Sequence, residues 1–327
     1  MRRTTGFIIG KFMPPTLGHV YLCQFAQNYC DDLTIMVESQ DGQPIDGFLR
    51  LRWMQEMFPR ARVVHCHETL PQDPAETPYF WDIWADVVKH YAPEVTDFVF
   101  ASEAYGVEIA KILGASFVPV DVARQCRPIS ATMVRENPFA HWDMLPEPVR
   151  AHYCKRIVLM GPESSGKTTL ANALGQALRT TVAPEYGRTY CDFFGEPDED
   201  GLRLIAHGHA ASTAAALRQA NRVLVEDTDA AMTQVWADMF GAKRDQVVEA
   251  HWTAPDLYVV CNIDVPWEAD GQRWFPQQEQ RLDFLDRCLK EVKRRGVPYV
   301  LASGSVQTRT EAVLKSLQRL MPKVLPD

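Results

Sequence analysis

One glycine-bounded loop in the second half of the chain has the residue types and spacing needed to bind a triphosphate. Residues 161–168 read GPESSGKT and fit G-x-x-x-x-G-K-[ST], with a short apolar run before them and a helix-forming stretch after them. Lys167 would place a positive charge at the β- and γ-phosphates, and Thr168 would bind Mg²⁺. A chance glycine turn would not need a strand and a helix on the correct sides. The residues predicted to contact ATP here are Gly161, Ser164, Ser165, Gly166, Lys167, Thr168 and Thr169.

Acidic residues follow a later apolar run in the same half, as EDTD at 226–229. Ligands of open α/β sheets bind at the carboxyl ends of strands, so we assign Asp227 to the magnesium side. Asp229 is the second choice for the metal and a candidate substrate contact. A solvated acidic turn is the open alternative for either residue.

A carboxylate and a guanidinium, Glu185 and Arg188, follow the apolar run 181–183. In kinases of small molecules this place meets the acceptor, so Glu185 is a candidate to orient or deprotonate a hydroxyl and Arg188 to contact phosphate or ribose. A structural ion pair is the open alternative. Farther on, PWEADGQR at 266–273 and the polar stretch to Arg281 suit a closing lid, whose Arg273 and Arg281 would meet the transferring phosphoryl group.

The start of the chain offers a different kind of phosphate site. An apolar run at 7–9 leads into GKFMPPTLGH, which resembles the [HT]-x-G-H signature of nucleotidyltransferases. We expect His19 to begin the first helix, where Thr16, His19 and free backbone N–H groups stabilise phosphate charge. A histidine that only caps or packs against the helix is the alternative, because four letters are a weak motif. Gly10, Lys11, Phe12 and Gly18 are assigned to ATP with them.

A second motif, PISATMVR at 128–135, supports the first, because it resembles the I-S-x-T-x-x-R signature of the same superfamily. Ser130 is a natural helix N-cap and would form an anion site with Thr132 and the backbone amides. Arg135 would bind phosphate from the next turn. Two phosphate sites in one domain fit the binding of ATP.

The elements that must position these residues follow an alternation of short apolar runs and longer amphipathic stretches, typical of βαβ units around a parallel sheet. The predicted class is α/β, with two doubly wound parallel-sheet domains, a Rossmann-like one followed by a P-loop one. Expected strands lie at 6–10, 33–38, 61–65, 97–101, 116–120, 156–160, 181–183, 223–225, 257–261 and 299–302. Three prolines within 137–150 break the pattern, so the expected domains are 1–148 and 149–327.

Within the first half, Leu22, Phe25, Ala26 and Tyr29 lie at i, i+3, i+4 and i+7 and predict one buried helix face.

Composition excludes several classes of function. The 34 basic and 42 acidic residues give a net charge of -8, which argues against broad attraction to DNA or anionic membranes. No apolar run is long enough to span a bilayer or resembles a secretion signal, so we expect a cytoplasmic protein. The eight cysteines form no C-x-x-C pair, and we expect reduced, mostly buried thiols. His65 and His67 would share a strand face but lack further ligands for a metal.

Further segments occur in an order typical of one family. They are GKFMP at 10–14, RLRW at 50–53, WDIW at 81–84, SE at 102–103, the stretch 129–138, EYGR at 185–188, GHA at 208–210, DTD at 227–229 and PWEADGQR at 266–273. Over nearly its whole length the chain resembles NadR-type bifunctional nicotinamide-nucleotide adenylyltransferases and ribosylnicotinamide kinases. The resemblance implies phosphorylation of nicotinamide riboside to the mononucleotide (NMN) with ATP and Mg²⁺. It also implies attack of that phosphate on the α-phosphorus of ATP, which forms NAD and pyrophosphate.

The resemblance implies substrate contacts as well, with Trp81 or Trp84 stacking on the cationic pyridinium ring. The residues assigned to the substrates are Trp81, Asp82, Trp84, Arg188, Asp229, Trp267 and Asp270. The expected ligands are ATP, nicotinamide riboside, NMN and NAD, without DNA or membrane partners.

Two departures from the family pattern leave alternatives open. Thr16 stands where the family commonly has a histidine, so a hydroxyl that cannot carry charge replaces one imidazole. The first domain could then be a vestigial module that binds NAD or NMN as a regulator. The family's helix-turn-helix domain is not expected, because the first strand begins by Phe7. A nucleotide-sensing regulator without catalysis is the third interpretation, and the intact phosphate loop counts against it.

Overall fold

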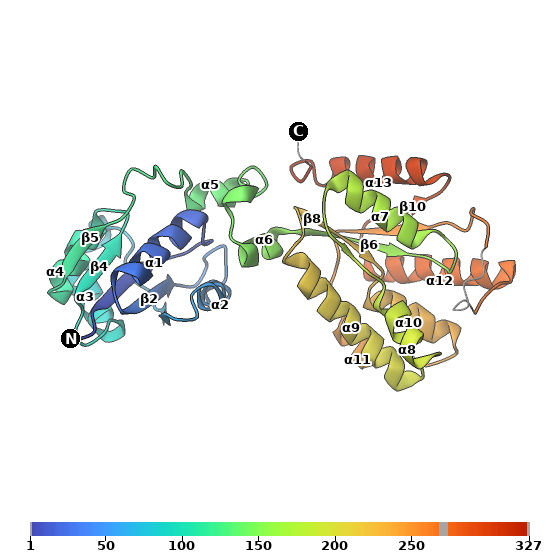
Figure 1. Cartoon of the computed structure of the whole chain (residues 1–327), viewed down its shortest axis with the longest axis horizontal. Coiled ribbons are helices and arrows are strands. Elements are labelled where there is room, and N and C mark those ends of the chain that lie inside the picture. Colours follow the sequence, from blue (N-terminus) through green and yellow to red (C-terminus); the bar gives the residue numbers. More distant parts are fainter. Residues whose placement is uncertain (1, 268–273, 326–327) are drawn as a thin grey trace. The chain divides into compact units, whose positions relative to one another are not determined.

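The computed structural model describes residues 2–267 and 274–325 of the chain. Two compact units, Met1–Val149 and Arg150–Asp327, each contain one sheet and its helices (Figure 1). The break between them lies one residue after the position expected from the prolines.

A five-stranded parallel sheet with the order β3-β2-β1-β4-β5 forms the centre of the first unit. Alternate residues of β1 face opposite sides, so Ile8 packs with α1 and α2 while Phe7 and Ile9 pack with α3 and α4. The strands are β1 (Thr5–Gly10), β2 (Asp32–Ser39), β3 (Arg62–His67), β4 (Phe98–Ala101) and β5 (Ser116–Pro119). The helices are α1 (Leu17–Tyr29), α2 (Gly47–Met57), η1 (Pro74–Glu76), α3 (Phe80–Tyr91), α4 (Tyr105–Leu113), α5 (Ala131–Glu136), η2 (Trp142–Met144) and α6 (Glu147–Tyr153), which crosses the break.

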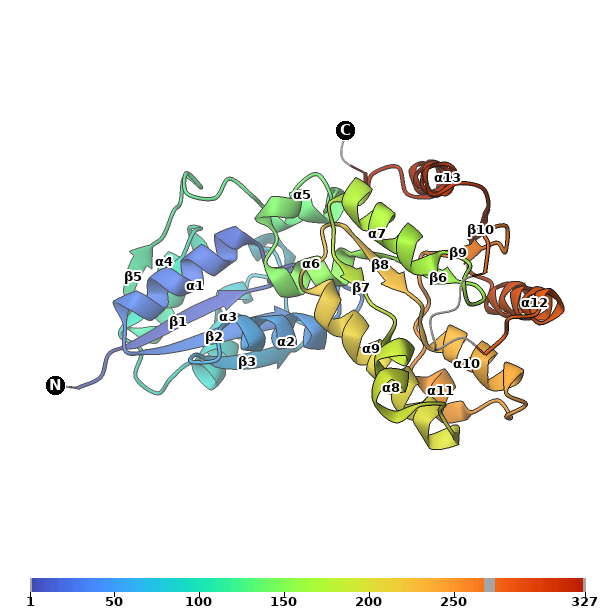
Figure 2. The ribbon, with the colours of Figure 1, turned by 45° about the vertical axis from the view of Figure 1, so that its right-hand side comes forward.

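A second five-stranded parallel sheet has the order β10-β9-β6-β8-β7. Helices α7 and α13 pack together on one of its faces, and α10 and α12 pack together on the other (Figure 2). The strands are β6 (Lys155–Met160), β7 (Val182–Ala183), β8 (Val223–Asp227), β9 (Leu257–Cys261) and β10 (Tyr299–Ala302). The helices are α7 (Lys167–Leu178), α8 (Tyr186–Phe194), α9 (Glu199–Leu217), α10 (Ala230–Met239), α11 (Gln246–Ala250), α12 (Gln278–Arg295) and α13 (Val306–Leu320).

The central strands β1 and β6 lie where the order of strands reverses. In the first sheet β1 lies between β2 and β4, and in the second β6 lies between β8 and β9. Such switch points open a crevice at the carboxyl ends of parallel strands, where ligands bind. Both phosphate motifs begin within or directly after these strands. The predicted α/β class is confirmed, and every expected strand is present.

Two expectations about α1 are corrected. The helix begins at Leu17, with Thr16 as its N-cap, so His19 lies at its third position and does not begin it. Tyr29 is 49% exposed, although its ring contacts those of Phe98 and Phe100, because it is the last residue of the helix.

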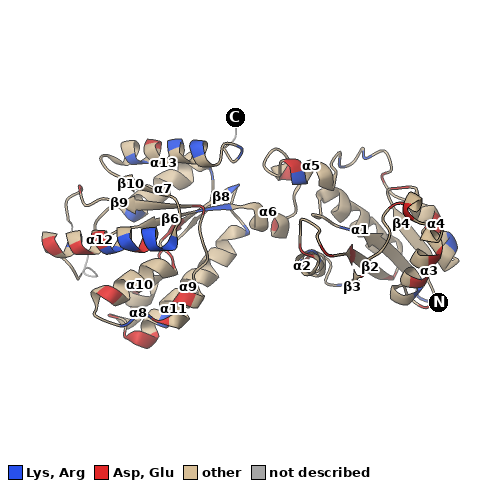
Figure 3. Ribbon diagram, turned by 180° about the vertical axis from the view of Figure 1, so that it is seen from behind, with Lys and Arg blue, Asp and Glu red and all other residues tan. Residues whose placement is uncertain are grey.

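The expected state of the cysteines is confirmed. All eight are free, and six of them are buried. Among the described residues, no group of side chains suits a metal cluster of three or more histidine, cysteine, aspartate or glutamate ligands, and no helix is long and apolar enough to cross a bilayer. Acidic and basic side chains mix over both units, and the last turn of α12 is basic, with Lys293, Arg294 and Arg295 (Figure 3).

Candidate active sites

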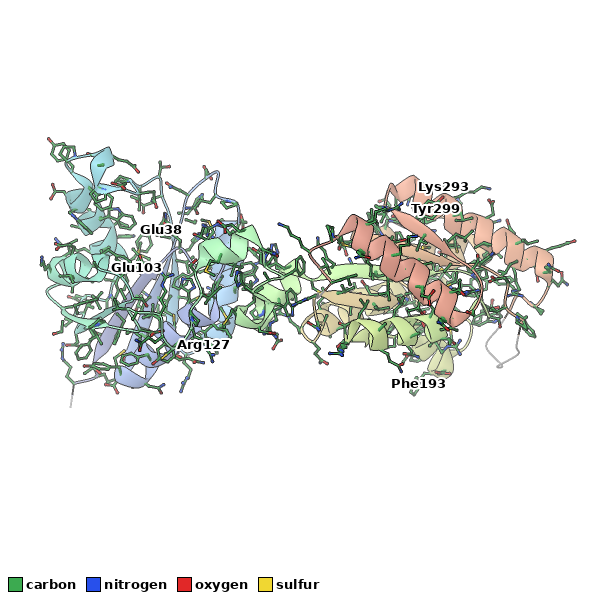
Figure 4. All side chains as sticks on the ribbon, turned by 90° about the horizontal axis from the view of Figure 1, so that it is seen from above. Glu38, Glu103, Arg127, Phe193, Lys293 and Tyr299 are labelled. Atoms are coloured by element: carbon green, nitrogen blue, oxygen red, sulfur yellow. The ribbon has the colours of Figure 1, made fainter. Side chains whose placement is uncertain are left out.

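A cavity of about 620 Å³ lies at the carboxyl end of the first sheet. It is formed by the end of β1, the start of α1, the segment that leads into α3, and α5. Glu38, Glu103 and Arg127, labelled in Figure 4, also line it. The predicted residues that line it are Gly10, Lys11, Phe12, Thr16, Gly18, His19, Trp81, Trp84, Ser130, Thr132 and Arg135.

His19 is held at this cavity by the residue that caps its helix. Its Nδ1 accepts a hydrogen bond from the backbone N–H of Thr16 at 3.0 Å, and the Thr16 hydroxyl lies 3.0 Å from the same nitrogen. Because a backbone N–H can only donate, the proton of the neutral ring lies on Nε2. Burial, and secondarily the charge of Arg124, lowers the pKa of His19 to about 4. His19 therefore offers a neutral Nε2–H donor to this cavity.

Arg135 connects two distant parts of the cavity wall. Its guanidinium donates to the carbonyl oxygen of Met13 in the loop after β1 and to the hydroxyl of Thr132, the latter at 3.0 Å. Ser130 caps α5, as predicted, by accepting from the N–H of Met133 at 3.2 Å. The two sequence motifs thus meet at one cavity, although they lie at opposite ends of the first unit's sequence.

The two predicted tryptophans line the cavity, whereas Asp82 does not. Trp81 and Trp84 lie three residues apart on α3 and line the same cavity, and Nε1 of Trp84 donates to the carbonyl oxygen of Pro71 at 3.0 Å. Asp82 follows Trp81 by one residue, about 100° around the helix, and is exposed on the other side. Asp82 does not line the cavity, so the structure does not support its assignment to substrate.

Sequence reasoning missed an acidic group in this cavity. Glu38 is the next-to-last residue of β2, is only 2% exposed, and accepts from Nε2 of Gln72 at 3.2 Å. Burial raises the pKa of this carboxyl group. Below it, the fully buried Arg50 donates to the carbonyl oxygens of Lys11 and Glu38 at 2.7 and 3.2 Å, which fixes the ends of β1 and β2 side by side. The alternation of β2 alone does not identify such a residue, because both of its faces are buried.

A smaller cavity, of about 150 Å³, lies at the carboxyl end of the second sheet. Both glycines of the loop adopt positive φ angles, +146° at Gly161 and +81° at Gly166, which a residue with a side chain rarely does. Lys167 donates through Nζ to the carbonyl oxygens of Gly161 and Pro162 at 3.0 and 3.1 Å. The predicted residues that line the cavity are Ser164, Ser165, Gly166, Lys167, Thr168, Thr169, Glu185 and Arg188.

The end of β8 provides a candidate magnesium position. The hydroxyl of Thr168 donates to Oδ2 of Asp227 at 2.5 Å. The other oxygen, Oδ1, is buried and has no hydrogen-bond partner among the described residues. A buried carboxylate oxygen beside a threonine hydroxyl is a ligand type that Mg²⁺ prefers, so these residues fit the metal predicted for them.

Asp229 is the N-cap of α10. Its carboxylate caps the helix by accepting from the N–H groups of Ala231 and Met232 at 3.0 and 3.2 Å, and it accepts from the hydroxyl of Tyr258 at 2.6 Å. Burial raises the pKa of Asp229 to about 6. The cavity is lined by its neighbour Thr228 and not by Asp229, so the geometry gives Asp229 a structural position instead of the predicted substrate contact.

Glu185 lies at the N-terminus of α8, where it faces the phosphate loop across the cavity. Burial raises the pKa of Glu185; the positive charge of Lys167 opposes the shift and the negative charge of Asp227 adds to it. A carboxyl group with a raised pKa is a stronger base once it is ionised, which suits the role predicted for it.

Other residues of this cavity were not assigned from the sequence. His209 projects from α9, and burial lowers its pKa to about 4. Thr233 is buried, and its hydroxyl has no hydrogen-bond partner among the described residues. Trp236, Phe240 and Trp274 form an aromatic wall, which the helical spacing of 236 and 240 could have suggested.

The predicted lid residues are placed differently. Arg281 is buried in α12, where it donates to the carbonyl oxygens of Ser164 and Val265 at 3.4 and 3.5 Å. It therefore contacts the backbone of the phosphate loop and is not an exposed residue of a polar lid. Trp267 is half-buried and does not line the cavity. Asp270 and Arg273 lie outside the described residues.

A further arginine ties the last helix to the phosphate loop. Arg309 of α13 is 1% exposed and donates to the carbonyl oxygens of Ser165, Asn262 and Gly304 at 2.6, 3.3 and 3.0 Å. It also pairs with the carboxylate of Asp264.

Comparisons with known proteins find relatives of the second unit and of the whole chain. A family model described as an AAA domain matches residues 156–309, within the second unit. The trifunctional NAD biosynthesis/regulator proteins NadR of Escherichia coli (strain K12) and Salmonella typhimurium (strain LT2) are each 30% identical to the chain, over 91% of it and 78% of their own length.

Solved structures of NadR proteins share the fold. One in complex with NR has a TM-score of 0.74, and one in complex with NAD and AMP-PNP has 0.76; each is 22% identical and covers 98% of this chain and 97% of its own. With relatives of this identity and coverage, the chain belongs to the NadR family of NAD biosynthesis proteins.

Proposed function

We propose that the chain carries out two successive ATP-dependent steps of NAD synthesis. The second unit phosphorylates nicotinamide riboside to NMN, and the first transfers the adenylyl group of ATP to NMN, which gives NAD and pyrophosphate. The observation that carries the proposal is the presence of two separate phosphate sites, one around His19 and Arg135 and one around Lys167. The ligands NR, NAD and AMP-PNP in related structures support the choice of substrates.

In the kinase step, the loop 161–168 binds the triphosphate through its backbone N–H groups and Lys167. Asp227 and Thr168 would hold the Mg²⁺ that comes with ATP, and this ion would neutralise charge on the phosphates. Glu185 accepts the proton of the ribose hydroxyl as that oxygen attacks the γ-phosphorus, and the bond from this phosphorus to the bridging oxygen breaks, so that ADP leaves. Arg188 contacts the ribose or the new phosphate. No covalent enzyme intermediate is needed.

In the adenylyl transfer step, a phosphate oxygen of NMN attacks the α-phosphorus of ATP and pyrophosphate leaves. The chain's residues position the two phosphates and stabilise the charge that develops between them. His19 donates through Nε2–H, and Arg135 adds a fixed positive charge whose orientation is set by Met13 and Thr132.

The other end of the first cavity suits a cationic nicotinamide ring. Trp81 and Trp84 provide aromatic faces, and Glu38 provides a buried carboxylate that attracts the pyridinium charge and accepts from the amide NH₂ group. The carboxylate of a nicotinate ring would face a like charge there.

A cytoplasmic location is part of the proposal, and the eight free cysteines support it. DNA binding is not part of it, although the relatives' name includes regulation.

The test is to incubate the pure protein with ATP, Mg²⁺ and nicotinamide riboside and to follow NMN and NAD separately. We expect NMN to form first and NAD to follow. NMN without NAD, even when NMN is supplied, would favour the first unit as a regulatory NMN- or NAD-binding module, the role that Thr16 leaves open. No NMN at all would refute the kinase.

A further inference from the structure

Glu163, the third residue of the phosphate loop, binds a segment far away in sequence. Its two carboxylate oxygens accept from the backbone N–H of Trp274 at 3.0 and 2.9 Å, and one of them also accepts from the N–H of Phe275 at 3.0 Å. Glu163 is 7% exposed. Hydrogen bonds from backbone N–H groups to a buried carboxylate are among the strong ones, so the loop and this segment are firmly joined.

The segment that Glu163 holds, Trp274 and Phe275, contributes to the wall of the cavity at the carboxyl end of the second sheet. The indole ring of Trp274 lines the cavity and packs edge-on against Trp236 at 5.7 Å and Phe240 at 5.9 Å between ring centroids. Because the backbone N–H of Trp274 is fixed by Glu163, the position of the phosphate loop determines where this aromatic wall lies.

The electrostatics of Glu163 make a direct role in phosphate binding unfavourable. A carboxylate in a loop that binds a triphosphate repels its ligand, and its negative charge also contributes to the raised pKa of Glu185. The hydrogen bonds to the N–H groups of Trp274 and Phe275 give the carboxylate a structural role instead.

We propose that Glu163 is a positioning residue that couples the phosphate loop to the wall formed by Trp236, Phe240 and Trp274, so that the triphosphate and the acceptor nucleoside bind synergistically. The proposal rests on the kinase function proposed above for the second unit. When ATP orders the loop, Glu163 sets the backbone at Trp274 and thereby the wall against which the nucleoside packs. By reciprocity, the nucleoside strengthens the binding of ATP by the same factor.

Two substitutions separate the hydrogen bonds of Glu163 from its charge. Glu163→Gln removes the charge but keeps an oxygen at the same reach. Glu163→Asp keeps the charge but shortens the side chain by one methylene, so the carboxylate no longer reaches both N–H groups. Glu279→Ala, which removes an exposed carboxylate near the start of α12, is the control for net charge.

The measurement is calorimetric titration of the full chain with nicotinamide riboside, alone and with saturating AMP-PNP and Mg²⁺. In the wild type and in Glu279→Ala we expect AMP-PNP to tighten nucleoside binding by at least about five-fold. Glu163→Gln should keep the ratio of the nucleoside Kd without AMP-PNP to the Kd with it within about two-fold of the wild-type ratio, and Glu163→Asp should reduce this ratio to about one. Glu163→Asp should also raise the KM for the nucleoside at saturating ATP.

Several outcomes would overturn the inference. It fails if the wild type shows no synergy, if Glu163→Asp keeps the ratio, or if Glu163→Gln loses it while Glu163→Asp does not, because charge would then be the cause. Thermal unfolding of each variant, followed by circular dichroism, serves as the check that its second unit is folded, because adenylyl transfer reports only on the first unit. A wild type that does not phosphorylate nicotinamide riboside would refute the proposed kinase itself, which is a separate result.

Discussion

The proposed phosphate site of the first unit is formed by side chains from opposite ends of the unit's sequence, whereas that of the second unit is formed by the backbone of one continuous loop. His19 is a neutral donor held by Thr16, and Arg135 reaches the same cavity from α5. The second site has two glycines with positive φ and a lysine within one short stretch.

The difference shows how each site tolerates change. The loop depends on local backbone geometry, so it is recognisable from sequence and sensitive to any side chain at Gly161 or Gly166. The first site depends on the fold to bring its parts together, so its signatures are short and a substitution such as Thr16 can be accepted within them.

The largest expected effect is on the kinase alone. Lys167→Ala should lower phosphorylation of nicotinamide riboside by on the order of 10³-fold or more, because it removes a charge that meets the transferring phosphoryl group. Adenylyl transfer to supplied NMN should remain, because its ATP binds in the other unit. Equal loss of both activities in separate assays would contradict the two-site comparison.

The reciprocal change concerns the first unit. His19→Ala or Arg135→Ala should each lower NAD formation from NMN by on the order of 10²-fold, as removing one preorganised donor does, and should leave the kinase unchanged. An intact rate of NAD formation in either variant would show that the cavity at β1 is not the adenylyl transfer site.

The protonation state of His19 makes a prediction about pH. Burial lowers its pKa to about 4, so the ring is almost entirely neutral over the range from pH 5.5 to 8. The rate of adenylyl transfer should therefore show no step near pH 6.5 that depends on His19, measured as kcat from pH 5.5 to 8 in the wild type. A step at that pH which Arg124→Ala or another neighbouring substitution shifts would instead indicate a charged imidazole.

A smaller effect is expected from Glu38, the buried acidic residue of the first cavity. Glu38→Gln should raise the KM for NMN by about five- to ten-fold with little change in kcat, because it removes a charge that attracts the pyridinium ring in ground and transition states alike. The same variant should bind the nicotinate analogue better than the wild type does. Unchanged selectivity between the two mononucleotides would place the ring elsewhere.

The smallest effects should come from Thr16. Thr16→Ala should lower NAD formation less than His19→Ala does, since the backbone N–H of residue 16 still orients the ring of His19. Thr16→His, which restores the commoner family residue, should be tolerated or raise the rate. A wild type and a Thr16→His variant that both form no NAD would favour the regulatory role for the first unit.

The fold was largely predictable from the sequence, because buried parallel strands appear as short apolar runs between amphipathic helices. All ten expected strands are present, including the short β7. The predicted start of α1 at His19 is wrong because the cap residue Thr16 lies inside the motif, so the helix begins two residues before the motif ends.

The sites were predictable to the extent that their residues lie in one motif. Residues 163–168 of the loop and the pair Glu185 and Arg188 line one cavity, whereas Gly161 does not. Glu38 and Thr233 could not be found, because each is a single polar residue in an apolar or mixed stretch, and only the packing of distant elements shows that it faces a cavity. His209 belongs to the segment GHA at 208–210, which the sequence indicates without giving the histidine a role. The sequence EDTD could not show that Asp227 lies at the candidate metal position while Asp229 caps α10, because helix caps and metal ligands use the same residue types.

The contact of Arg309 with Ser165 has a consequence for synthesis on the ribosome. The two residues are 144 positions apart, and the arginine lies in the last helix of the chain. Domains emerge and fold from the N-terminus, so the first unit can complete its cavity while the second is still being made. The phosphate loop of the second unit receives this buried donor only after the ribosome has passed residue 309, and a nascent chain should acquire the ability to bind NMN before it can retain ATP at Lys167.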